Sequence, residues 1–178
     1  MGDDRRTYGP LELLEGRWVV GDSHRPDGCW VEFRPEGMVR HAGGTADEPI
    51  PWSRVLLGIR IQIGQGTKGS RYQGSLGLTG LIGGLPGPFR GRGGGYLGMT
   101  LRHPYEDVRL AFDRHAEWYK PAHVLLLAEL MTQTVAAGDA HRLGDAEWLG
   151  WAVGRLERVT SWPVGRQPAA VVQAALRD

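Results

Sequence analysis

Short apolar segments with a period of two recur through the first two thirds of the chain, and this alternation is typical of half-buried β-strands. From Ile59 to Ile63, for example, isoleucines alternate with Arg60 and Gln62. The turn Pro35-Glu36-Gly37 predicts a hairpin, because proline fits the first central position of a tight turn and glycine tolerates the backbone angles that follow. The predicted strands are 17–20, 29–34, 38–41, 56–63, 97–102 and 108–113.

After Lys120 the apolar spacing changes to three and four, which predicts helices. Pro121 suits the first turn of a helix, and Gly138 is placed to end it. Asp145 is a good N-cap for a second helix, and a last short helix is expected over 168–176. Strands followed by helices predict an α+β fold, in which a bent antiparallel β-sheet or a partly open barrel precedes two C-terminal helices and a short tail helix.

We expect one domain over residues 1–178, because this length suits a single core. Its β part is expected over about 17–118, with a glycine-rich loop at 64–95, and its helical part over about 121–177. The opening residues do not form a secretory signal, and the longest apolar run is far shorter than the roughly 20 residues of a membrane helix. The sequence therefore predicts a cytoplasmic protein without a transmembrane segment, and it leaves the oligomeric state open.

Charge is distributed unevenly, although the net charge is only +1. Residues 49–105 contain no Asp or Glu, whereas both flanking segments carry more acids than bases. Such a positive segment attracts phosphate, lipid headgroups or nucleic acid, or it pairs with the acidic flanks of its own fold. The seven bases of this acid-free segment are Arg54, Arg60, Lys68, Arg71, Arg90, Arg92 and Arg102.

The glycine-rich loop carries four of these bases, Lys68, Arg71, Arg90 and Arg92, and aromatic residues lie between them. Its first glycines match a GxGxxG pattern, but further glycines follow at once and prevent the helix that a dinucleotide site needs. A long loop of this kind is either functional or simply mobile. We take the four bases as the candidate ligand-binding residues for an anionic ligand or a partner protein, with nucleic acid as a less favoured anion.

Candidate catalytic and metal-ligating residues are few. Asp113, His115 and Glu117 would share one face if their strand continued, as metal ligands or as a histidine flanked by carboxylates. The strand pattern ends there, however, so a solvated polar face is the favoured interpretation. Cys29, the single cysteine, lies in a strand pattern and is interpreted as a small core residue. We therefore expect no catalytic residue, no metal site and no cofactor.

A predicted hairpin, Phe33-Arg34-Pro35-Glu36-Gly37-Met38, is followed by a polar loop and then by the phrase Ile50-Pro51-Trp52-Ser53-Arg54-Val55. This order of motifs gives residues 17–137 a resemblance to bacterial pleckstrin-homology-like domains. It implies a bent antiparallel sheet capped by a helix and a role in binding, not in catalysis. The glycine-rich loop and the helix after Asp145 depart from that pattern.

A second resemblance is to calycin barrels, through the triplet Gly16-Arg17-Trp18. It implies a barrel that binds, or transforms, a small apolar molecule. Seven tryptophans are many for this length, and they either fill the core or line such a cavity. The sequence thus favours a non-catalytic, pleckstrin-homology-like binding module, with a calycin-like barrel as the alternative.

Overall fold

The computed structural model describes residues 6–63, 94–117, 119–159 and 166–177. The described strands form two antiparallel sheets. In the seven-stranded sheet, six strands follow one another in chain order, and the seventh, β7, pairs with β5. The strands are β1 (Thr7–Tyr8), β2 (Leu11–Leu14), β3 (Arg17–Val20), β4 (Cys29–Arg34), β5 (Gly37–Ala42), β6 (Thr45–Ala46) and β7 (Ile50–Pro51).

The second sheet has three strands in the order β10-β9-β8. They are β8 (Val55–Ile63), β9 (Gly94–Leu101) and β10 (Glu106–Asp113). Together the described strands are bent and do not close into a barrel, which confirms the predicted α+β class with a bent antiparallel sheet. The strands β1, β6 and β7 were not predicted, because segments of two residues are too short to show a period, and β2 was not predicted because Leu11–Leu14 has no clear alternation.

Three α-helices follow the strands, as predicted: α1 (Pro121–Ala136), α2 (Ala146–Glu157) and α3 (Pro168–Arg177). Pro121 is the first residue of α1. The side chain of Asp145 accepts hydrogen bonds from the backbone N–H groups of Glu147 and Trp148, so it is the expected N-cap of α2. None of the described helices is both long enough and apolar enough to cross a membrane.

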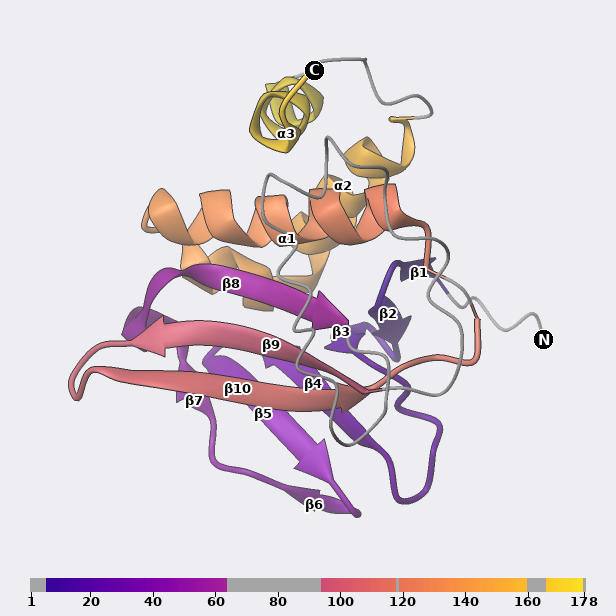
Figure 1. Ribbon diagram of the computed structural model, residues 1–178, viewed down its shortest axis with the longest axis vertical. Coiled ribbons are helices and arrows are strands. Elements are labelled where there is room, and N and C mark those ends of the chain that lie inside the picture. Colours follow the sequence, from indigo (N-terminus) through magenta and orange to yellow (C-terminus); the bar gives the residue numbers. More distant parts are fainter. Residues whose placement is uncertain (1–5, 64–93, 118, 160–165, 178) are drawn as a thin grey trace.

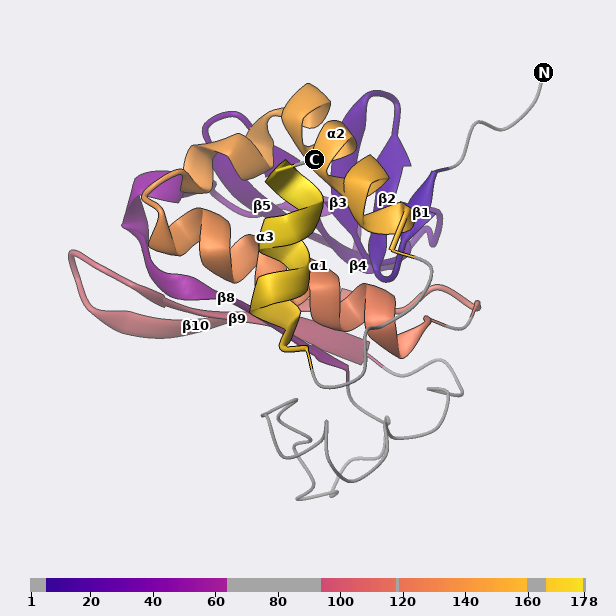
Figure 2. The same ribbon diagram turned by 90° about the horizontal axis from the view of Figure 1, so that it is seen from above.

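The helices cover one side of the sheets. Figure 1 shows α1 lying along β8, with the three-stranded sheet in front of the seven-stranded one. Seen from above, α3 crosses over α1 (Figure 2). Because α1 packs against a sheet and against other helices, its buried apolar residues form one broad band over about half of its circumference. They are Val124, Leu126, Leu127, Leu130, Met131 and Val135.

A β-bulge in β8 lets α1 approach the sheet. The register with β9 shifts between Val55 and Ile59, and Gly58 lies within the shift with φ +104°. A Cβ atom at Gly58 would lie 3.2 Å from Cγ2 of Thr132 on α1. Glycine is therefore needed here both for the backbone angle and for the close contact.

The two faces of the seven-stranded sheet differ in character. Trp18, Val20 and Phe33 belong to the apolar core on one face. On the opposite face the register aligns Glu12, Val19, Glu32 and Val39 across four strands, and all four are buried. Two buried carboxylates in one row need compensating partners, because an unpaired buried charge is strongly destabilising.

Candidate functional site

The predicted ligand-binding residues Lys68, Arg71, Arg90 and Arg92 lie outside the described residues, so their role stays a prediction. The strands on either side of them are described. Ile63, the last residue of β8, pairs with Gly95 near the start of β9. The segment that carries the four bases therefore begins and ends at the same end of the three-stranded sheet.

Arg54 shows the internal pairing that the sequence left open. Its Nη2 atom lies 2.8 Å from Oε1 of Glu106, and its Nε donates to the backbone oxygen of Arg102 at 3.2 Å. The flanking acid Glu106 thus compensates one base of the acid-free segment. Arg60 and Arg102, by contrast, are exposed, and their guanidinium groups form no hydrogen bond or ion pair with the described part of the chain.

Arg60 has a second arginine beside it on the outward face of the three-stranded sheet. Gly98 of β9 pairs with Arg60 of β8 on one side and with Arg109 of β10 on the other. Both arginines are exposed, and their Cα atoms are about 10 Å apart, the width of two strand spacings. A Cβ atom at Gly98 would meet no atom within 4 Å, so the space between the two side chains is open.

The acids nearest in register to this row, Asp107 and Asp113, form no ion pair with Arg60 or Arg109 in the described part of the chain. Asp107 accepts a hydrogen bond from Oγ1 of Thr100 at 2.7 Å. Asp113 accepts the backbone N–H of Cys29 at 2.9 Å and lies 3.6 Å from Arg25. Arg109, like Arg60, has no ion pair within the described ranges. Arg109 lies outside the acid-free segment, and only the strand register places it beside Arg60.

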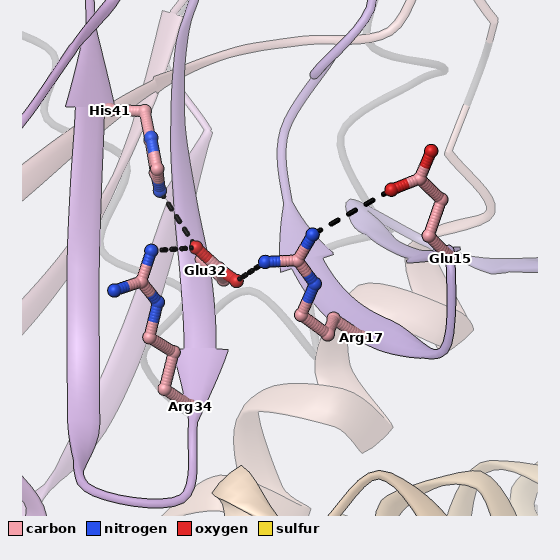
Figure 3. Close-up of polar contacts among 5 residues, drawn as sticks. All are labelled: Glu15, Arg17, Glu32, Arg34 and His41. Carbon is pink, nitrogen blue, oxygen red and sulfur yellow. Dashed lines mark hydrogen bonds and ion pairs between the residues drawn. The ribbon is translucent and has the colours of Figure 1, made fainter.

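Glu32 is the centre of a charge cluster on the outward face of the seven-stranded sheet (Figure 3). Its carboxylate is 1% exposed and contacts Arg17 at 2.6 Å, Arg34 at 2.7 Å and His41 at 2.9 Å. Glu15 extends the cluster, 3.7 Å from Arg17. These groups compensate one another, so the cluster offers little net charge to a ligand.

The pKa of Glu32 reflects this compensation. Burial raises the pKa of the carboxyl. Hydrogen bonds from Arg34 and His41 and the charges of Arg34 and Arg17 lower the pKa by more than burial raises it, so it lies below its ordinary value. Glu32 therefore stays ionised at neutral pH. Its function in the structure is to hold Arg17, Arg34 and His41 against the sheet.

Glu12, the second buried carboxylate of the row, contacts two histidines. Oε1 lies 3.0 Å from Nε2 of His24, and Oε2 lies 3.0 Å from Nε2 of His115. The Tyr119 hydroxyl lies 2.8 Å from Nδ1 of His115 and accepts the backbone N–H of the same residue at 2.9 Å. A hydroxyl that donates to Nδ1, with Nε2–H donating to Glu12, satisfies all three groups.

His115 and Tyr119 border a pocket of about 170 Å³, which is also lined by Thr7, Gly9, Glu117, Lys120 and His123. Burial raises the pKa of Tyr119 to about 12, although the backbone N–H of His115 and the charge of Arg114 lower it. The phenol therefore stays protonated at neutral pH. Burial, followed by the charge of Lys120, lowers the pKa of His123. A protonated Tyr119 suits the anchoring of the His115 ring better than nucleophilic chemistry.

The residues weighed as metal ligands do not converge. Asp113 faces Cys29 and Arg25, His115 faces Glu12, and Glu117 is exposed. Among the residues that the structure describes, no group of His, Cys, Asp and Glu could hold a metal ion. The chain turns away after Asp113, where β10 ends, so a shared strand face does not form.

Two tryptophans in the core are fixed by hydrogen bonds. The indole N–H of Trp18 donates to the oxygen of Ala146 at 3.1 Å, and that of Trp52 donates to the oxygen of Arg34 at 2.7 Å. Three pockets can be compared with this alternative: the one beside Lys120, a second beside Arg158 and a third beside Arg17. None of the three is lined by a tryptophan of the described part of the chain. The alternative of an indole-lined cavity stays a prediction.

Comparison of the chain with models of protein families, with curated proteins and with solved structures finds no match. The feature that the sequence did not reveal is the row Arg60–Gly98–Arg109, because it depends on the pairing of three strands.

Proposed function

We propose that this protein is a non-catalytic binding module that recognises an anionic ligand, or an anionic surface of a partner protein, through its basic three-stranded sheet. The contact residues are Arg60 and Arg109, together with Lys68, Arg71, Arg90 and Arg92 of the adjoining segment. The observation that carries the proposal is the uncompensated pair Arg60 and Arg109 on either side of the open space at Gly98.

Guanidinium groups suit such a role. Each presents several N–H donors in a planar fork that matches phosphate and carboxylate oxygens. The guanidinium groups of Arg60 and Arg109 lie on either side of the open space at Gly98, so they can approach one anion from opposite sides. The acid-free segment that joins β8 to β9 adds four positive charges within the same stretch of chain, which strengthens the attraction of an anion over distances up to the screening length.

The resemblance to pleckstrin-homology-like domains supports binding over catalysis. It rests on the hairpin around Pro35 and on the phrase from Ile50 to Val55. In the structure the first contains the turn between β4 and β5, and the second forms β7, a short 3-10 helix (Trp52–Arg54) and the first residue of β8. Binding is the general use of such domains, so the resemblance and the charged sheet face point in the same direction.

The test is binding across a salt series to vesicles with and without an anionic lipid, and to a single-stranded oligonucleotide. We expect binding at low salt that weakens as salt rises. The double variant Arg60→Gln/Arg109→Gln is expected to bind about 30-fold more weakly, since a basic residue near an anionic surface contributes about 1 kcal/mol. A variant with Lys68, Arg71, Arg90 and Arg92 changed to alanine should lose more.

Arg54→Gln is the matched control, because Glu106 already compensates Arg54. It should bind as the wild type does. The proposal fails if neither probe binds at low salt, or if the double variant and the control bind equally well. Vesicle binding without oligonucleotide binding identifies a lipid headgroup, and the reverse identifies nucleic acid.

A further inference from the structure

A groove between the end of α2 and α3 combines an apolar wall with arginines. Val171, Ala174 and Ala175 of α3 face Val159, which follows α2, and the space between them is about 250 Å³. The small alanine side chains leave this space open. The charged residues that line the groove are Arg155, Arg158 and Arg166.

The two arginines at the end of α2 lie on the same face of the chain, three positions apart. Such like charges at this helical spacing repel each other. Arg155 places its guanidinium over the ring of Trp151, 5.6 Å from its centroid, but neither Arg155 nor Arg158 has an ion pair in the described ranges. Glu157, the acid between them, is bound instead to Arg6 at 2.9 Å.

We propose that this groove binds a free single-chain amphiphile with an anionic head group, such as a fatty-acid carboxylate. The head group lies at Arg155 and Arg158, where it relieves their repulsion, and the alkyl chain lies against Val171, Ala174 and Ala175. The groove is lined by none of the residues of the basic sheet face. The inference therefore goes beyond the proposed function and does not depend on it.

The combination of surfaces selects this class of ligand. A bare phosphate or acetate would use the arginines but leave the apolar wall in water. An uncharged alcohol would cover the wall but leave the arginines uncompensated. Only a molecule with an anionic head group and an alkyl chain compensates the arginines and removes the apolar wall from water at the same time.

The experiment is calorimetric titration of the full chain with decanoate below its micelle concentration, with decanol and acetate as the two partial ligands. We expect decanoate to bind about tenfold or more tightly than either, because only decanoate makes both kinds of contact. Binding should also show a negative heat-capacity change from buried apolar surface.

Two sets of variants test the two halves of the groove. Arg155→Gln/Arg158→Gln should weaken decanoate about tenfold and leave decanol unchanged, whereas Arg177→Gln, on α3 outside the groove, should have no effect. Ala174→Phe should fill the space and abolish binding, whereas the same change at the exposed Ala170 should not. Urea unfolding checks that each variant is folded. If Ala174→Phe does not fold, the arginine variants alone decide whether the groove binds decanoate.

Several results would overturn the inference. Equal affinity for decanol and decanoate, or equal binding by the arginine variants and the wild type, would show nonspecific apolar binding. Binding to anionic vesicles without binding of monomeric decanoate would assign these arginines to a membrane surface instead. Arg60→Gln/Arg109→Gln should leave decanoate binding intact, so failure of the sheet-face proposal and failure of this one are distinguishable.

Discussion

Oε2 of Glu12 lies 3.0 Å from Nε2 of His115, and this contact joins β2 to the segment that follows β10, 103 residues further along the chain. Both side chains are buried. Tyr119 holds the far side of the imidazole ring at 2.8 Å. The contact therefore links the N-terminal strands to the second sheet and to the start of α1, and it orders the wall of the pocket beside Lys120.

Replacement of His115 is expected to destabilise the protein more than replacement of His24. His115→Ala removes a buried partner from Glu12 and from Tyr119, which costs about 1–3 kcal/mol of the free energy of unfolding. His24 contacts the other oxygen of Glu12 but is half exposed, so water can replace it in His24→Ala. Urea unfolding of both variants measures the difference, and equal losses would contradict the role of His115.

Glu32 should make stability depend on pH on the acid side. Its folded-state pKa lies below its ordinary value, so the unfolded chain takes up a proton first as pH falls. Its stabilising contribution is complete above about pH 4.3, the ordinary pKa of a glutamate, and is lost as pH falls through the folded-state value. Glu32→Gln should cost about 1–3 kcal/mol at pH 7 and progressively less below pH 4.

The measurement is urea unfolding of the wild type and of Glu32→Gln at a series of pH values. Glu48→Gln is the control, because Glu48 is exposed between β6 and β7 and has no hydrogen bond or ion pair in the described ranges. A constant difference between wild type and Glu32→Gln from pH 7 to pH 3 would mean that the cluster does not lower the pKa of Glu32.

Gly98→Glu should abolish anion binding at the three-stranded sheet without unfolding it. The new carboxylate would stand between Arg60 and Arg109 and compensate both, and it would enter open space. The backbone of Gly98 does not have the positive φ that would strain a larger residue. Vesicle binding at low salt checks this prediction against Gly98→Gln, which has the same size without the charge. Equal binding by the two variants would remove this face from the proposed site.

The thiol of Cys29 is expected to react slowly in the folded protein. Burial raises its pKa, the charge of Arg40 lowers it, and Asp113 and Asp47 raise it. The thiol also donates to the oxygen of Ala111 at 3.0 Å. Because Cys29 is the single cysteine of the chain, the rate of thiol alkylation by iodoacetamide measures the reactivity of this residue alone. Alkylation at pH 8 should be about tenfold or more slower than in urea, and Asp113→Asn should speed it. Equal rates in buffer and in urea would contradict the burial of this group.

Local chemistry was sufficient to predict most of the elements. The alternation from Ile59 to Ile63, the turn after Arg34, and the caps at Pro121 and Asp145 each act over a few residues, so the sequence shows them directly. For the same reason the α+β class and the order of strands before helices could be predicted. The strands β1 and β2 were not predicted. Their formation depends on pairing, β1 with β2 and β2 with β3, and not on an alternating pattern of their own.

The sequence by itself determined where positive charge is concentrated, since a segment without acids is visible in the order of residues alone. Only the tertiary structure decided which of the described bases lack an ion pair. Arg54 forms an ion pair with Glu106, whereas Arg60 lies in one row with Arg109, on the other side of Gly98. It also turned His115 toward Glu12 instead of toward Asp113 and Glu117. The physical reason is that strand register and sheet ends bring together residues far apart in the chain, and no local pattern encodes these pairings.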